Sequence, residues 1–278
     1  MKTIIDAEKE EFLKKKALWV RQKVMEMCLK AGAGHIAPAY SWTEIAVALY
    51  YGGILRIDPK NRFWEDRDRF ILSKGQACAS LYAILADLGF FPVEELMTYC
   101  QTGSRLGGHS ESHVPGVEAF TGSLGHGLSI ASGMALAAKI DKKDYFTFVL
   151  LGDGELQEGS NWEAAMFAGH HKLDNLIAIV DRNNLQAIDF TEDAMALEPL
   201  EAKWKSFGWK VSHVDGHNFK DIIKCFKKLK KSKSKKPAVV IAHTIKGKGV
   251  SFMENKSEWH FRIPEGEEVK KAKEELGL

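Results

Sequence analysis

Cysteine is scarce in this 278-residue chain, and the few cysteines form no motif. Cys28, Cys78, Cys100 and Cys225 are scattered without CxxC spacing. This pattern argues against a disulfide framework and against a cysteine-ligated zinc site, and it is typical of free thiols in a reducing compartment. We therefore expect a cytoplasmic protein.

Long apolar runs and an excess of charge of one sign are also missing. No stretch approaches the about 18 continuous apolar residues of a membrane span, and the N-terminal segment MKTIIDAEKEEFLKKK is charged rather than signal-like. Lys and Arg together number 39 against 37 Asp and Glu, a net charge of +2. We expect neither a membrane nor a nucleic acid as a partner.

The length and the alternation of patterns predict one α/β domain. A chain of 278 residues can bury roughly three quarters of its unfolded surface in such a domain but has little room for another. We assign residues 1–278 to a single domain, with a C-terminal tail from about residue 262. β-rich apolar runs alternate with helical patterns, which predicts a doubly wound, mostly parallel sheet with helices on both faces. The predicted strands are 70–72, 145–151, 176–180, 210–214 and 238–243, and the predicted helices include 7–30, 77–88 and 128–139.

Two segments have the spacing of a capping box, and one segment is too rich in glycine for regular structure. Ser41 to Glu44 and Ser160 to Glu163 are each predicted to open a helix. Seven glycines fall within the 25 residues from Gly103 to Gly127. We interpret this stretch as a loop that contributes to an active site.

The most informative spacing joins two predicted strand ends. Gly152-Asp153-Gly154 follows one strand, and after 28 further residues Asn183 follows the next. Parallel strands end at the same edge of a sheet, where α/β proteins bind ligands. The two side chains would therefore face one crevice, about 5 Å apart on adjacent strands or twice that across an intervening strand.

A carboxylate and a carboxamide at that edge suit a hard cation that holds a diphosphate. Mg²⁺ prefers oxygen ligands and is usually bound by one or two protein groups together with phosphate oxygens and water. Asp153 supplies the charge and Asn183 a neutral oxygen, while Gly152 and Gly154 leave room for phosphate and the Gly154 N–H can donate to it. The simpler alternative is that both polar residues form turns. Lys246-Gly247-Lys248-Gly249 is either a phosphate-binding loop or a solvated one.

These residues resemble the thiamine-diphosphate fingerprint, and the chain is similar to transketolases. GDGELQEG, HHKLDNLIAIVDRNN, AGAGHIAP, DRDRFILSKG, GGHSESHVPGVEAFTGSLGHGLSIASGMALAAK and HTIKGKGVSFMEN resemble transketolase segments that occur in the same order. The resemblance covers roughly residues 10–265 and implies the thiamine-diphosphate-binding fold.

The resemblance implies a cofactor and the residues that bind it. The cofactor is thiamine diphosphate with Mg²⁺, or Ca²⁺ or Mn²⁺ in its place. The implied metal ligands are Asp153, Asn183 and the backbone carbonyl of Leu185. The implied cofactor-binding residues are Gln76, Gly122, Leu124, Gly152, Asp153, Gly154 and Asn183.

Four residues are similar to catalytic groups of the family. His35 and His109 resemble histidines that hydrogen-bond the donor sugar, and His260 resembles one near the diphosphate and the reaction centre. Glu158 resembles the residue that reaches across an interface toward the glutamate of a pyrimidine-binding domain. Its alternative interpretation is a carboxylate favoured by the positive end of a helix.

The chain departs from the family pattern at three places. Gln76 stands where a histidine is usual, so a proton-transfer role there is lost. His126 stands where glutamine is commoner. Phe261-Arg262 follow Trp259-His260 where a small residue and a basic residue are common. These departures leave the substrate open.

The resemblance covers only the diphosphate-binding part of transketolase, which predicts the N-terminal subunit of a split enzyme. Its partner would be a C-terminal subunit with the pyrimidine-binding and C-terminal domains, in two copies of each chain. The pair would move a two-carbon ketol unit between sugar phosphates, as in the pentose phosphate pathway. The alternatives are a transketolase with another donor or acceptor, such as a dihydroxyacetone-forming or specialised-pathway enzyme, and a non-catalytic scaffold.

Overall fold

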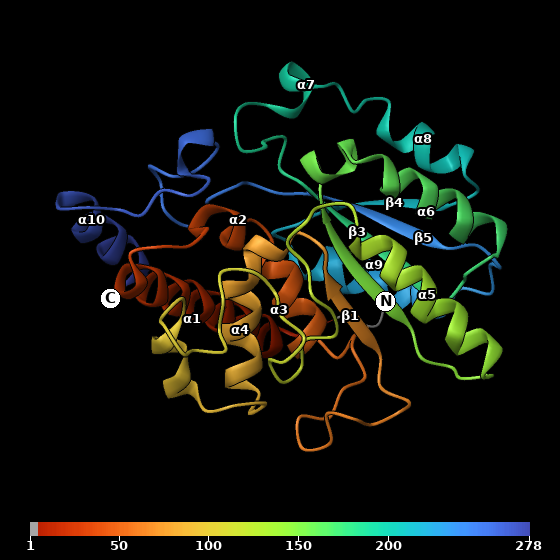
Figure 1. Cartoon of the computed structure of the whole chain (residues 1–278), viewed down its shortest axis with the longest axis horizontal. Coiled ribbons are helices and arrows are strands. Elements are labelled where there is room, and N and C mark those ends of the chain that lie inside the picture. The colour runs from red at the N-terminus through yellow and green to blue at the C-terminus, as the bar shows by residue number, and fades with distance from the viewer. Residues whose placement is uncertain (1–4) are drawn as a thin grey trace.

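A computed structural model describes residues 5–278, so the start of the charged N-terminal segment lies outside the described residues. The chain folds around a five-stranded sheet in which every pair of neighbouring strands is parallel, in the order β1-β2-β3-β5-β4 (Figure 1). The strands are β1 (Arg69–Leu72), β2 (Thr147–Gly152), β3 (Leu176–Arg182), β4 (Lys210–Asp215) and β5 (Ala238–His243). The predicted doubly wound α/β fold is confirmed, with strand ends shifted by at most two residues.

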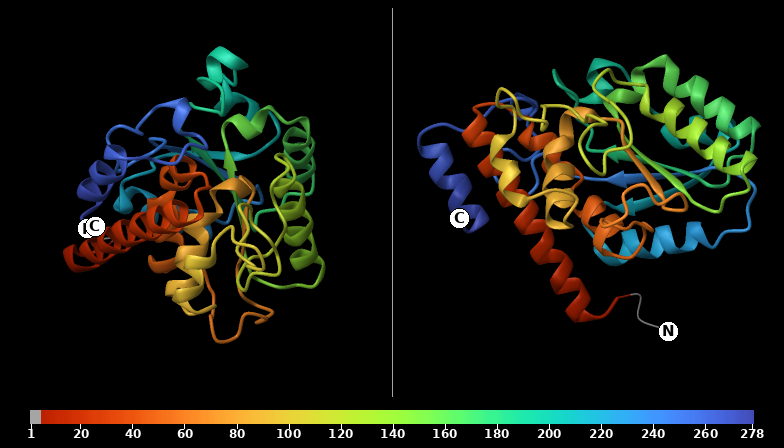
Figure 2. Two further views of the ribbon diagram at one scale, coloured as in Figure 1. Left: turned by 60° about the vertical axis from the view of Figure 1, so that its left-hand side comes forward. Right: turned by 60° about the horizontal axis from the view of Figure 1, so that its bottom comes forward.

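Alternate residues of the central strands face two separate apolar cores. Phe148 and Leu150 of β2 point into one core, and Val149 and Leu151 point into the other. This period of two requires helices on both faces of the sheet, and Figure 2 shows them there. The first core is covered by α1 (Ala7–Ala31), α3 (Thr43–Tyr51), α4 (Cys78–Asp87) and α9 (Phe219–Lys230). The second is covered by α5 (Gly127–Ile140), α6 (Gly159–His170) and α8 (Leu200–Ser206).

The remaining α-helices of residues 5–278 are α2 (Ile36–Ser41), α7 (Thr191–Ala194) and α10 (Glu267–Leu276). All six residues of α2 are buried, and its apolar side chains belong to the first core. Helix α10 belongs to the segment predicted as a tail, yet it packs against α1 and buries Ala272 and Leu276 (Figure 1). The Gln22 amide of α1 donates to the Leu276 carbonyl at 2.8 Å. The glycine-rich stretch contains neither helix nor strand until α5 begins at Gly127, as predicted.

Helices begin close to both predicted starts, α3 at Thr43 and α6 at Gly159, but neither serine caps its helix, because each serine has a tertiary partner instead. Ser41 ends α2, and its hydroxyl donates to the Asp181 carboxylate at 2.7 Å. Ser160 lies inside α6 and donates to the Gly125 carbonyl at 2.9 Å. Each serine therefore joins two distant segments, a function that the local pattern does not reveal.

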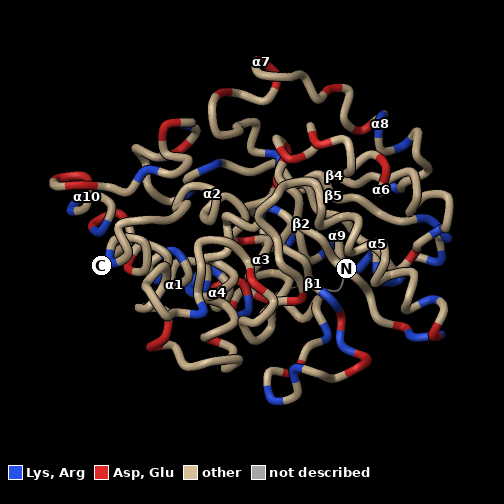
Figure 3. The backbone as a smooth tube through the Cα atoms, in the orientation of Figure 1, with Lys and Arg blue, Asp and Glu red and all other residues tan. Residues whose placement is uncertain are grey.

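The distribution of charge follows the balanced composition. Figure 3 shows basic and acidic residues interspersed along the chain. None of the helices within residues 5–278 combines the length and the apolar character needed to cross a membrane.

The burial of Leu150 in β2 predicts a large loss of stability when this side chain is truncated. Leu150 is fully buried, so Leu150→Ala leaves a cavity and should lower the free energy of unfolding by about 2–5 kcal/mol. The control Ile140→Ala alters a side chain that is 70% exposed, and should change it by less than about 0.5 kcal/mol. Urea denaturation of both variants measures the two values, and equal losses would contradict the assignment of Leu150 to the core.

Candidate functional site

The polar ends of β2 and β3 meet at the carboxyl edge of the sheet. Gly152 is in register with Asp181, so Asp153 and Asn183 follow directly adjacent strands. The Asn184 N–H donates to the Asp153 carboxylate at 2.6 Å. Of the two arrangements predicted from the sequence, the one without an intervening strand is confirmed.

Asp153 is a buried carboxylate with few compensating charges. It is 1% exposed, accepts the Gly154 N–H at 2.8 Å and lies 3.4 Å from the Arg182 guanidinium. Burial, and then the neighbouring Asp181, raise the pKa of Asp153 to about 6. A carboxylate in this environment would be stabilised by a bound cation.

Asn183 and Leu185 present oxygens next to Asp153. The Asn183 side-chain amide donates to Ser41 Oγ at 2.9 Å, and its Oδ1 accepts the Leu185 N–H at 3.0 Å. Asn184 between them has φ +64°, the left-handed conformation that turns the chain here. The described residues contain no group of three His, Cys, Asp or Glu side chains able to hold a metal. The predicted ligand set differs from such a group, because it combines one carboxylate, that of Asp153, with the amide oxygen of Asn183 and the backbone carbonyl of Leu185.

A buried network below this edge fixes the position of Asn183. Asp181 forms an ion pair with Lys74 and accepts hydrogen bonds from Ser41 and Thr244. Lys74 also donates to the Pro38 carbonyl at 3.1 Å. The sequence analysis did not predict Lys74, Asp181 or Thr244 as site residues, although Asp181 stands two positions before Asn183 in the fingerprint.

Lys246, the first lysine of the KGKG segment, is buried in the cleft. It is 2% exposed and donates to the Gln186 carbonyl at 2.9 Å, and its Nζ lies 2.9 Å from His260 Nδ1. Burial, and then the charge of Lys74, lower its pKa to about 8. Lys248 in contrast has a side chain that is 37% exposed. The first lysine of the segment belongs to the cleft, and the second does not line it.

Most of the predicted cofactor residues line one cleft of about 150 Å³. Gly122 lies beside His109, whose ring would be 3.3 Å from a Cβ at that glycine. The Gln76 Oε1 atom is buried without a hydrogen-bond partner. Two lysines, Lys74 and Lys246, also line the cleft. The predicted residues that line it are Gln76, Leu124, Gly152, Asp153, Gly154, Asn183, Leu185 and His260.

The three predicted catalytic histidines come together beside the cleft. The ring centroid of His35 lies 5.3 Å from that of His260 and 5.9 Å from that of His109. Burial lowers the pKa of His35 to about 4 and that of His260 to about 3, with a further contribution from nearby positive charges. Both imidazoles are therefore neutral at pH 7 and able to donate and accept hydrogen bonds. Phe261 packs on His35 as a fourth ring.

Glu158 stands apart from the cleft. It is the N-cap residue of α6, but its side chain makes no capping hydrogen bond and is exposed. Its neighbour Glu155, which sequence reasoning missed, is buried and accepts the N–H groups of Gly125 at 3.0 Å and Gly152 at 2.9 Å. Glu155 thereby attaches the glycine-rich loop to the end of β2.

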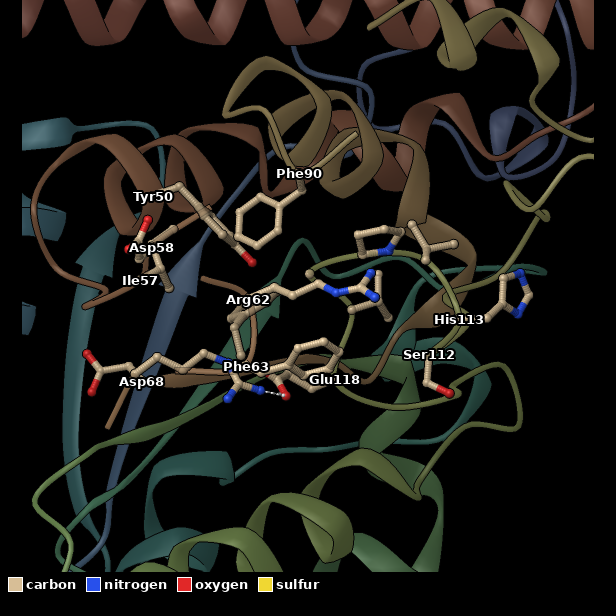
Figure 4. A pocket seen from close by; sticks show the side chains of 16 residues that line it. Tyr50, Ile57, Asp58, Arg62, Phe63, Asp68, Phe90, Ser112, His113 and Glu118 are labelled. Carbon is tan, nitrogen blue, oxygen red and sulfur yellow. Dashed lines mark hydrogen bonds and ion pairs between the residues drawn. The ribbon is translucent and has the colours of Figure 1, made fainter. Parts of the chain in front are cut away.

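A second cavity, of about 290 Å³, lies near the opposite end of β1 (Figure 4). It is larger than the cleft at the carboxyl edge, but it contains none of the predicted site residues. Two of its charged groups, Arg67 and Glu118, pair with each other at 2.7 Å. Size alone therefore does not locate the functional site.

The fold and the cleft define an α/β domain of the class that binds diphosphate ligands at the carboxyl edge of a parallel sheet. A profile described as "Transketolase, thiamine diphosphate binding domain" matches residues 13–278. A subunit of the apulose-4-phosphate transketolase of Phocaeicola vulgatus is 46% identical over 92% of this chain and 90% of its own length. The 6-deoxy-6-sulfo-D-fructose transketolase subunit SqwG of a Clostridium species is 42% identical over 91% of this chain and 92% of its own length.

Longer transketolases also match. The crystal structure of the Campylobacter jejuni transketolase superposes with a TM-score of 0.90 and 35% identity, over 99% of this chain and 43% of that one. The chain therefore belongs to the transketolase family, a family of transferases, and corresponds to its thiamine-diphosphate-binding N-terminal part. The resemblance inferred from the sequence motifs is confirmed.

The buried lysine predicts a pH-dependent stability. Because the pKa of Lys246 is lowered to about 8 in the folded chain from 10.5, the unfolded chain binds more protons between these pH values, and stability rises with pH. The free energy of unfolding of the chain should therefore gain about 3 kcal/mol between pH 8 and 10.5 relative to Lys246→Met. Denaturant titrations across this range measure the difference, with Lys248→Met as the control. Parallel curves for Lys246→Met and the unmodified chain would show that Lys246 is not desolvated.

Proposed function

We propose that this chain is the N-terminal subunit of a thiamine-diphosphate-dependent transketolase. With a C-terminal subunit it would transfer a two-carbon ketol unit from a ketose phosphate to an aldose. The observation that carries the proposal is the convergence of Asp153, Asn183 and Lys246 on one buried cleft, in a chain that belongs to this family.

The residues of the cleft fit a metal-bound diphosphate. The carboxylate of Asp153, the amide oxygen of Asn183 and the carbonyl of Leu185 are the hard oxygen ligands that Mg²⁺, Ca²⁺ or Mn²⁺ prefers. Lys246 is a buried cation that an anion would stabilise. The unpaired Oε1 of Gln76 offers an acceptor to a donor group on the ligand.

Each predicted residue then has a definite task. When bound, thiamine diphosphate supplies the nucleophilic carbon that carries the two-carbon unit. Lys246 holds the diphosphate, and Gly122 and Leu124 lie along the ring system. The Gly154 N–H, which was predicted to donate to the diphosphate, donates to the Asp153 carboxylate at 2.8 Å instead. His35 and His109 hydrogen-bond the hydroxyls of the donor sugar, and His260 lies near the diphosphate and the reaction centre. Because burial lowers the pKa of His35 and of His260, both are neutral imidazoles at pH 7.

The proposed partner is a chain with the pyrimidine-binding and C-terminal domains, in two copies of each protein. Relatives of similar length carry names that describe them as transketolase subunits. The exposed Glu158 is available to reach a group on a partner. Exposed apolar side chains follow the turn at Asn183 and Asn184, at Ile188, Phe190 and Met195, and such groups mark association surfaces. The cytoplasmic location and the pentose phosphate pathway stay predictions.

A second candidate is a transketolase that uses another sugar. Two relatives carry names that specify apulose 4-phosphate and 6-deoxy-6-sulfo-D-fructose. In this chain Gln76 occupies the cleft position where the family resemblance expects a histidine. A scaffold without catalysis is less favoured, because it would not require the buried charges of Asp153 and Lys246.

The proposed function predicts a two-chain activity. This chain and a C-terminal subunit, with thiamine diphosphate and Mg²⁺, should transfer a ketol unit from xylulose 5-phosphate to ribose 5-phosphate, whereas either chain alone should not. Asp153→Ala should reduce turnover at least about 100-fold because it removes the only charged metal ligand. A coupled assay of the aldose product measures both effects.

The matched control is Asp144→Ala, at a carboxylate whose side chain is 81% exposed. Its activity should equal that of the unmodified pair. Cofactor binding by the pair without turnover on these sugars would favour the second candidate, and an absence of cofactor binding would favour the scaffold.

Replacing Gln76 by histidine should change the pH dependence of kcat/KM. Gln76→His introduces an imidazole with a pKa near 6.5 where an amide does not titrate. The variant pair should show an additional ionisation, between about pH 5 and 8, in its profile of kcat/KM against pH. The control Gln101→His changes an exposed residue and should leave the profile unaltered. Identical profiles for Gln76→His and the unmodified pair would mean that position 76 does not contact the reacting groups.

A further inference from the structure

Phe261 packs on one of the three histidines, His35, and its ring cannot form a hydrogen bond. Its centroid lies 4.6 Å from that of His35, with the ring planes at 51°. Phe261 is nevertheless 58% exposed, so it is not part of the apolar core. One side of the ring covers His35, and much of the remainder is open to solvent at the edge of the histidine group.

The residues on both sides of Phe261 hold this ring in place. His260 is tied to Lys246 at 2.9 Å, and Trp259 is 2% exposed and packs on Phe252 with centroids 5.1 Å apart. Arg262 turns back over the Trp259 ring at 4.2 Å and donates to Glu268 at 2.6 Å. The backbone at position 261 is thus fixed from two directions, and the Arg262 charge is already engaged elsewhere.

A fixed aromatic ring affects a polar substrate in two ways. It fills volume next to His35, and it offers no partner to a sugar hydroxyl that loses its water there. A hydroxyl left unpaired in such a contact weakens binding. A longer sugar has more hydroxyl-bearing carbons to pass along this wall than a short one.

We propose that Phe261 is a specificity-determining residue that restricts the acceptor to short aldoses, of the class of three-carbon aldose phosphates. The inference rests on the proposed function, since it concerns the substrate of the same site. Phe261 does not take part in the chemical step; it decides which aldose reaches the histidines.

The test compares two acceptors with the thiamine-diphosphate- and Mg²⁺-loaded pair. With xylulose 5-phosphate or another donor that the pair accepts, kcat/KM is measured for glyceraldehyde 3-phosphate and for ribose 5-phosphate. The unmodified pair should prefer the three-carbon aldose. Phe261→Ala should shift the ratio toward ribose 5-phosphate about tenfold or more, mainly through KM, because pocket contacts of this size discriminate by such factors.

A binding measurement without catalysis accompanies the assay. Ribose 5-phosphate alone, without a donor, is titrated into the loaded pair by calorimetry, and its Kd should fall about tenfold in Phe261→Ala. Phe261→Leu keeps most of the volume and should keep the preference of the unmodified pair. Phe63→Ala removes a ring that is 74% exposed at the second cavity, and should change neither value.

The outcomes separate this inference from the proposed function. Transfer that is active but has the same acceptor ratio in Phe261→Ala would overturn the role of Phe261 alone. A preference of the unmodified pair for ribose 5-phosphate would overturn it as well. No transfer to either aldose by the unmodified pair, with any ketose phosphate as donor, would overturn both proposals.

Discussion

The architecture of the site depends on one buried carboxylate, that of Asp181. It is fully buried at the end of β3, and its ion pair with Lys74 and its hydrogen bonds from Ser41 and Thr244 join the ends of β1, α2, β3 and β5. Removing one partner of a buried pair leaves an uncompensated charge, which is costly. Ser41 in turn accepts the amide of Asn183. The network therefore fixes the orientation of a proposed metal ligand before any ligand arrives.

The same edge of the sheet also carries charges that remain poorly compensated. Burial raises the pKa of Asp153 and lowers that of Lys246, which means that folding destabilises the charged form of both groups. A protein that needed this edge only for stability would do better with apolar residues there. A cation beside Asp153 and an anion beside Lys246 would relieve both penalties. A ligand that carries both charges would therefore bind here and offset the cost of burying these two groups.

Patterns close together in the chain predicted most of the fold and part of the site. Asp153 and Asn183 were identifiable because strand periodicity and the parallel connection determine where both strands end. Lys74, Asp181 and Glu155 were missed because their importance comes from contacts between segments far apart in sequence. The serines of the two predicted capping boxes have distant partners for the same reason. The contact of Phe261 with His35 joins residues more than 200 positions apart, and no local pattern indicates it.

The packing of α10 on α1 has a consequence for synthesis on the ribosome. Helix α1 is synthesised before the residues that it contacts, because the Arg21 guanidinium donates to the carbonyl of Lys248 at 2.7 Å and the Gln22 amide to that of Leu276. Both partners lie more than 200 residues later in the sequence. Such non-local contacts slow folding and expose apolar surface meanwhile. The side of α1 that Lys248 and α10 cover therefore stays uncovered until both of these segments have been made.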